Sequence, residues 1–105
     1  MEYQATFGID CGVSTGFGVK YPDYVREQEI ISADNPQVAY QNAMNLARKF
    51  ADDYLSNPDK CLTTVQLLSL DGPKGAVSFD ASKAVVKRSM LEHLLALDSE
   101  EKRTP

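Results

Sequence analysis

The chain of 105 residues contains no tryptophan, one histidine and two cysteines, and none of its apolar runs is long. No segment approaches the roughly 20 apolar residues that cross a bilayer, so we expect no membrane partner. Cys11 and Cys61 lie far apart without CxxC spacing, and with His93 alone beside them they form neither a disulfide framework nor a zinc pattern. Residues 1–4 lack the basic start of a secretory signal, which predicts a cytoplasmic protein.

Basic residues are outnumbered by acidic ones, 11 to 15, and the net charge is −4. This balance repels phosphate backbones and disfavours nucleic acid as a partner. The composition, 43% hydrophobic and 25% charged, is typical of a soluble globular protein, and the length suits one hydrophobic core. We therefore predict a single compact domain over residues 1–97 and a disordered polar tail over residues 98–105.

Apolar and polar residues alternate over residues 3–10, the pattern of a half-buried strand. A break at Cys11-Gly12 predicts a turn, followed by a second strand over residues 16–21. Pro22-Asp23 predicts another turn, because proline presets its first central position, and a third strand follows over residues 24–32. The first third of the chain thus predicts a three-stranded antiparallel meander.

A long helix is predicted next, with Asp34 or Asn35 as its N-cap and Pro36 at its first helical position. Asn57-Pro58 predicts its end. One apolar stripe recurs at helical spacing and is expected to cover the sheet. It consists of Ala39, Ala43, Leu46, Ala47, Phe50 and Tyr54.

Residues 62–70 are apolar on both faces, which predicts an interior strand, and residues 71–75 have the composition of a turn before a short strand over residues 76–79. Asp80 or Ser82 is expected to cap a final helix. Its apolar face would consist of Val86, Met90, Leu94 and Leu97. The predicted order is β-β-β-α-β-β-α, an α+β fold in which two helices pack on one face of a mostly antiparallel sheet.

The segment from Phe7 to Lys20 carries the strongest hint of chemistry. Its strand-end Asp10, the following Gly12 and the run Thr15-Gly16-Phe17-Gly18-Val19 resemble the opening hairpin of the ribonuclease H-like superfamily, and among its members the Holliday-junction resolvases. The resemblance implies that Asp10 binds Mg²⁺ or Mn²⁺ for phosphodiester cleavage. A two-metal site needs further carboxylates, for which Asp71, Glu92 and Asp98 are the candidates.

The same segment permits two other interpretations. Gly12, Ser14, Thr15 and Gly16 can present backbone N–H groups to a phosphate, although no Walker-type lysine follows. The segment can also be a hairpin without any site, because its glycines permit positive φ angles and Asp10 can cap the turn.

Lys83, Lys87 and Arg88 are spaced to form a basic ridge on the predicted last helix, which is a candidate binding surface. Because reactive side chains are few and scattered, we predict a non-catalytic binding or protein-interaction module without a cofactor. A metal-dependent nuclease that uses Asp10 and Asp71 is one alternative. Self-association through an exposed strand edge, as a homodimer, is the other.

Overall fold

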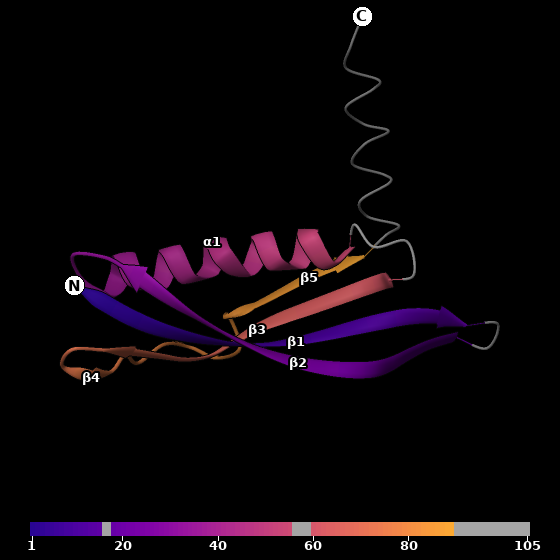
Figure 1. Cartoon of the computed structure of the whole chain (residues 1–105), viewed down its shortest axis with the longest axis horizontal. Coiled ribbons are helices and arrows are strands. Elements are labelled where there is room, and N and C mark those ends of the chain that lie inside the picture. The colour runs from indigo at the N-terminus through magenta and orange to yellow at the C-terminus, as the bar shows by residue number, and fades with distance from the viewer. Residues whose placement is uncertain (16–17, 56–59, 90–105) are drawn as a thin grey trace, which may run out of the picture.

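The computed structural model describes residues 1–15, 18–55 and 60–89, and within them one antiparallel sheet carries one helix on one face (Figure 1). The elements are β1 (Glu2–Thr15), β2 (Gly18–Ser32), α1 (Pro36–Leu55), β3 (Lys60–Gly72), β4 (Gly75–Ala76) and β5 (Val85–Ser89). The strand order is β2-β1-β3, and β3 then pairs with β4 at one end and with β5 at the other. The predicted α+β class is confirmed.

β1 and β2 form one long hairpin rather than three short strands, so the predicted meander is wrong. Their ladder runs from Glu2 opposite Ser32 to Thr15 opposite Gly18. The break at Cys11-Gly12 is a register shift, and Pro22-Asp23 lies inside β2. A bulge absorbs an extra residue without reversing the chain, and proline is tolerated in β2 because that strand lies at the sheet edge.

The predicted helix is confirmed as α1. Its first turn is capped by Asn35, whose Oδ1 accepts a hydrogen bond of 2.9 Å from the Val38 backbone N–H. Four alanines spaced four residues apart are completely buried along α1, and we call them the alanine seam: Ala39, Ala43, Ala47 and Ala51. Such small side chains let the helix lie close to the sheet. Phe50 of α1 meets Phe7 of β1 edge to face, with ring centroids 5.3 Å apart.

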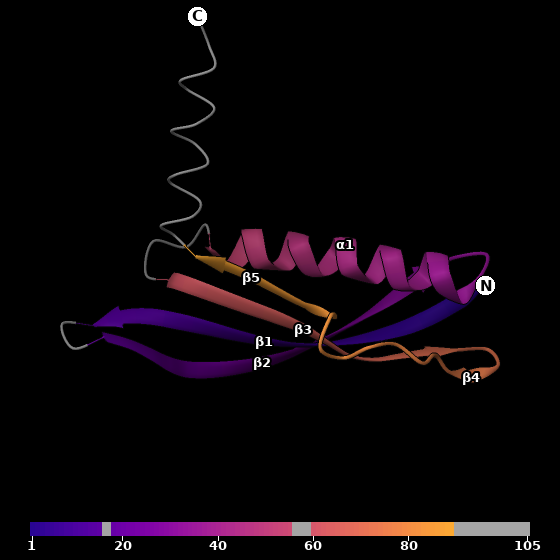
Figure 2. The ribbon, with the colours of Figure 1, turned by 180° about the vertical axis from the view of Figure 1, so that it is seen from behind.

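β3 lies inside the sheet, as predicted, between β1 and β5. Its residues Val65, Leu67 and Leu70 are buried with Phe7 and Ile9 of β1 in the core beneath α1. The opposite face of the sheet carries no helix within the described part of the chain, as the view from behind also shows (Figure 2). The sheet therefore has a covered face, on which α1 packs, and an open face, on which no described helix lies.

The predicted final helix is wrong where the structure tests it, because residues 85–89 form β5. Ala84 and Val86 are buried while Lys87 is exposed, and Val86 pairs with Val65 of β3. Two adjacent β-branched residues fit this half-buried strand better than a helix. Residues 90–105, including the rest of that helix and the predicted tail, lie outside the described residues.

The short returning strand predicted over residues 76–79 is shorter, covering only Gly75 and Ala76. Gly72 pairs with Gly75 across Pro73-Lys74, and Gly75 has a φ of 110°. Glycine adopts this conformation without the penalty that a Cβ atom brings. The predicted turn is therefore present, and it closes the β3–β4 hairpin.

Replacing Gly72 tests how tightly the buried Tyr3 ring packs against this hairpin. A Cβ atom at Gly72 would lie 2.5 Å from Cε1 of Tyr3, a side chain that is 3% exposed. Gly72→Ala should therefore lower the free energy of unfolding by about 1–3 kcal/mol in urea titrations. Gly8→Ala is the matched control, since the Tyr24 side chain it would meet is 53% exposed and can swing away. Equal losses for the two variants would contradict this packing.

Thr63 offers a second stability test. Its side chain is completely buried, and its Oγ1 has no hydrogen-bond partner among the described residues. Burial of an unpaired hydroxyl is unfavourable, so Thr63→Val, which keeps the β-branched shape, should raise the free energy of unfolding by about 1 kcal/mol. A loss of stability in the same denaturant experiment would show that the hydroxyl has a partner.

Candidate functional site

Asp10 and Asp71 do not share a site. Asp10 lies within β1 between Tyr24 of β2 and Thr64 of β3, whereas Asp71 lies at the far end of β3, opposite Gln4. Gln4 and Asp10 are six positions apart along β1, about 20 Å at roughly 3.3 Å per residue. Within residues 1–15, 18–55 and 60–89, no group of three or more histidine, cysteine or acidic side chains is placed to hold a metal ion. Glu92 and Asp98 lie outside the described residues.

The proposed phosphate nest lies in extended backbone. Gly12, Ser14 and Thr15 belong to β1, and Gly16 lies outside the described residues. Successive N–H groups of a strand point to opposite sides, whereas a nest needs several that converge. Ser14 and Thr15 pair with Val19 and Gly18 of β2, and Gly12 lies at the register shift, so the described part of this segment is strand rather than a phosphate-binding turn.

Cys11 is buried on the helix-covered face, opposite Thr63 of β3. Tyr54, near the end of α1, lies close enough to interact with it electrostatically. Burial raises the pKa of the Tyr54 phenol above 10.0, and the charges of Glu27 and Cys11 add to this effect. The thiol thus belongs to the packed layer between α1 and the sheet.

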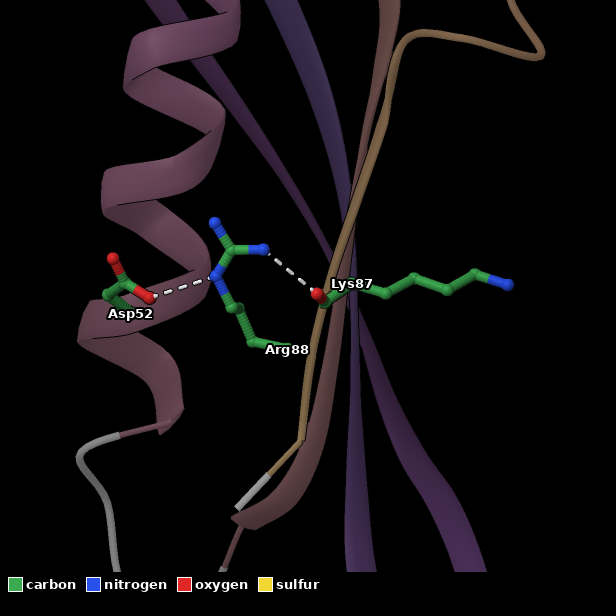
Figure 3. Close-up of polar contacts among 3 residues, drawn as sticks. All are labelled: Asp52, Lys87 and Arg88. Atoms are coloured by element: carbon green, nitrogen blue, oxygen red, sulfur yellow. Dashed lines mark hydrogen bonds and ion pairs between the residues drawn. The ribbon is translucent and has the colours of Figure 1, made fainter. Parts of the chain in front are cut away.

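The basic ridge does not form, because its three residues do not share a helix face. Lys83 lies in the turn before β5, and Lys87 and Arg88 are neighbours on β5 with side chains on opposite sides (Figure 3). Arg88 points toward α1, where its Nε lies 3.3 Å from Oδ1 of Asp52, and it also donates a 3.0 Å hydrogen bond to the Lys87 carbonyl. Such a surface ion pair contributes less than about 1 kcal/mol.

A groove runs between the N-terminal half of α1 and the segment of residues 72–83. It consists of three adjoining hollows of about 380, 460 and 390 Å³, a size range that suits ligand binding. Neighbouring hollows share walls. The first two share Pro36, Val77 and Ser78, and the last two share Tyr40, Gln41 and Lys83. Figures 1 and 2 place β4 at the same end of the sheet as the start of α1.

The second wall of the groove is a loop that β3 holds at both ends. The Val77 N–H donates a 2.7 Å hydrogen bond to the Leu70 carbonyl, and the Leu67 N–H donates a 2.9 Å bond to the Ala84 carbonyl. The two ends of the loop are thus bonded to β3 residues that lie only three positions apart. Phe79 packs against Tyr40 of α1 with ring centroids 5.7 Å apart, which fastens the loop to the helix.

Cationic side chains predominate in the groove, although the chain as a whole is acidic. Lys74, Arg48 and Lys83 line it, and Asp80 is the carboxylate among its described lining residues. The Asp80 Oδ1 accepts hydrogen bonds from the Ser82 hydroxyl at 2.6 Å and the Ser82 N–H at 3.0 Å, and these lower the pKa of Asp80. Arg48 donates a 2.8 Å bond to Asn45 Oδ1, which holds the guanidinium beside the groove.

Sequence reasoning missed the groove as a site, although it singled out Lys83. The walls come from segments that are distant in the sequence and meet only in the fold. One signal was available. The first sixteen residues of α1 contain no acidic side chain, and both helix carboxylates, Asp52 and Asp53, lie near its end. That asymmetry leaves the groove side of α1 without negative charge.

No protein-family model matches the chain, and comparisons with curated proteins and with solved structures give no significant match. In the described part of the chain, no helix combines the length and apolar character needed to cross a membrane.

The position of Asp10 predicts the outcome of a metal titration. Because its two cross-strand neighbours are Tyr24 and Thr64, Mn²⁺ should broaden the NMR signals near Asp10 no more than those near the exposed carboxylates of the chain. Asp10→Asn should leave the broadening pattern unchanged. Selective broadening around Asp10 that this variant abolishes would instead support the nuclease alternative.

Proposed function

We propose that the chain is a non-catalytic protein-interaction module of the cytoplasm, and that it holds a segment of its partner in the groove. The observation that carries this proposal is the groove itself, in which three hollows join along one side of α1. Apolar, neutral polar and cationic side chains together line its walls, and such a mixed surface suits recognition of a protein segment.

The contacts that hold the two walls of the groove in place favour binding of a partner segment with little rearrangement of the chain. The loop wall is tied to β3 at Val77 and Ala84, and the helix wall is fixed through the alanine seam. Preformed surfaces bind with a smaller loss of conformational entropy than surfaces that must become ordered. We therefore assign binding to the groove rather than to the open face of the sheet.

Self-association through the β2 edge of the sheet is less well supported. β2 is an edge strand, but Arg26, Glu27 and Glu29 place charges along it, and the strand contains Pro22. Charges and proline are the features that disfavour pairing with a further strand. A homodimer built on β2 would need to accommodate both.

Peptide selection with a groove-filling variant tests this function. Peptides selected from a random display library against the purified chain should bind it with micromolar affinity. Gln41→Trp places a bulky ring in the shared wall of two hollows and should weaken that binding at least about tenfold, or 1.4 kcal/mol. Affinity is measured by isothermal titration calorimetry.

Asn42→Trp is the matched control, because Asn42 is an exposed neighbour on α1 that lines none of the three hollows. It should change the affinity less than about twofold. Equal effects of the two variants, or none from either, would contradict binding in the groove.

A further inference from the structure

We propose that the groove takes an extended acidic segment of a partner protein, in which glutamate or aspartate alternates with apolar residues. This inference rests on the proposed function and names the chemistry of the bound segment. Lys74, Arg48 and Lys83 against the single carboxylate of Asp80 make the described lining cationic. The net charge of the whole chain is −4, so the positive charge of the lining is a local property of the groove.

The cations are distributed along the groove rather than gathered at one point. Lys74 lies in the first hollow, Lys83 in the second and third, and Arg48 in the third. A small anion would meet only one or two of them. An extended segment with several carboxylates can reach all three, and because each exposed ion pair is weak alone, contact with all three strengthens binding.

The length of the groove suits such a segment. From Pro36 to Arg48 α1 rises about 18 Å, at roughly 1.5 Å per residue. An extended peptide rises about 3.3 Å per residue, so five or six residues match this length. Alternate side chains of an extended peptide point to opposite sides, which directs one set into the groove and leaves the other at its rim.

The first two hollows of the groove also have apolar lining residues. Tyr3, Pro36 and Val77 line the first hollow, and Tyr40 and Phe79 line the second. Apolar side chains of a bound segment gain free energy by removing this surface from water. The bound segment is therefore expected to be both acidic and apolar rather than uniformly charged.

A single-stranded nucleic acid fits the groove less well. Proteins that bind one stack its bases on free aromatic faces. Here the rings of Tyr40 and Phe79 pack on each other at a tilt of 31°. Asp80 also places a carboxylate beside Lys83, in the hollow that both residues line.

The test uses the fluorescently labelled heptapeptide Glu-Leu-Glu-Pro-Glu-Leu-Glu and fluorescence polarisation on the full chain. The peptide should bind, and its affinity should fall several-fold as salt rises from about 50 to 300 mM. Lys83→Gln and Arg48→Gln should each weaken binding about fivefold. Asp80→Asn should tighten it about twofold, because it removes the opposing charge and keeps the oxygen that Ser82 contacts.

Two charge-matched controls lie outside the groove. Lys87 is exposed on β5, and Lys49 follows Arg48 on α1 without lining any of the three hollows. Lys87→Gln and Lys49→Gln should change the affinity less than about twofold. Losses equal to those of Lys83→Gln and Arg48→Gln would show nonspecific charge attraction and overturn the proposal.

Two further probes complete the test. Equal binding of Lys-Leu-Lys-Pro-Lys-Leu-Lys, or tighter groove-dependent binding of a short single-stranded RNA, would also overturn the inference. If library-selected neutral peptides bind with sensitivity to Gln41→Trp while the glutamate peptide does not bind, the acidic segment is refuted and the proposed function stands. If Gln41→Trp weakens the binding of no peptide, the proposed function fails as well.

Discussion

The close contact between α1 and the sheet is the constraint on which the rest of the structure depends. Along the alanine seam no side chain is larger than a methyl group, so the helix backbone approaches β3 and β5 closely. Larger residues on either side of the seam, such as Phe50 and Met44, then pack over the neighbouring strands. One helix of this kind covers one face of the sheet, and the position of its N-terminal half sets one wall of the groove.

The other wall is attached to β3 beside an irregularity in that strand. The register of β3 with β1 shifts between Ser69 and Leu67. The loop that follows β4 is hydrogen-bonded to β3 at this shift, where the Leu67 N–H donates to the Ala84 carbonyl. This loop is short and bonded to β3 at both ends. Phe79 is therefore held against Tyr40, and Lys83 is held beside α1. The two hydrogen bonds to β3 thus hold the segment that carries Asp80 and Lys83 in place beside α1.

Local signals predicted α1 and β3 well because those signals lie within each element. Asn35, Pro36 and the apolar stripe define α1, and the two-sided apolar pattern of residues 62–70 defines an interior strand. These local signals failed where the pairing of distant strands decides the secondary structure. Gly12 and Pro22 suggest turns in isolation, yet the long β1–β2 ladder accommodates both. Val86 was assigned to a helix by its spacing with Met90, Leu94 and Leu97, whereas its pairing with Val65 of β3 places it in a strand.

The candidate site was less predictable than the fold. Asp10 and Asp71 were grouped by residue type, and only the antiparallel register shows how far apart they lie. Lys83 was grouped with Lys87 and Arg88 by helical spacing that the strand does not have. The groove depends on contacts between residues 36–48 and 72–83, which no single-segment pattern contains.

Chemical-shift mapping tests the central claim most directly, because it reports where a bound segment lies. With ¹⁵N-labelled chain and the acidic heptapeptide, the account predicts amide shifts concentrated on residues 37–48 and 74–83, on both walls of the groove. Shifts centred instead on Tyr24, Arg26 and their neighbours on the open face of the sheet would contradict it.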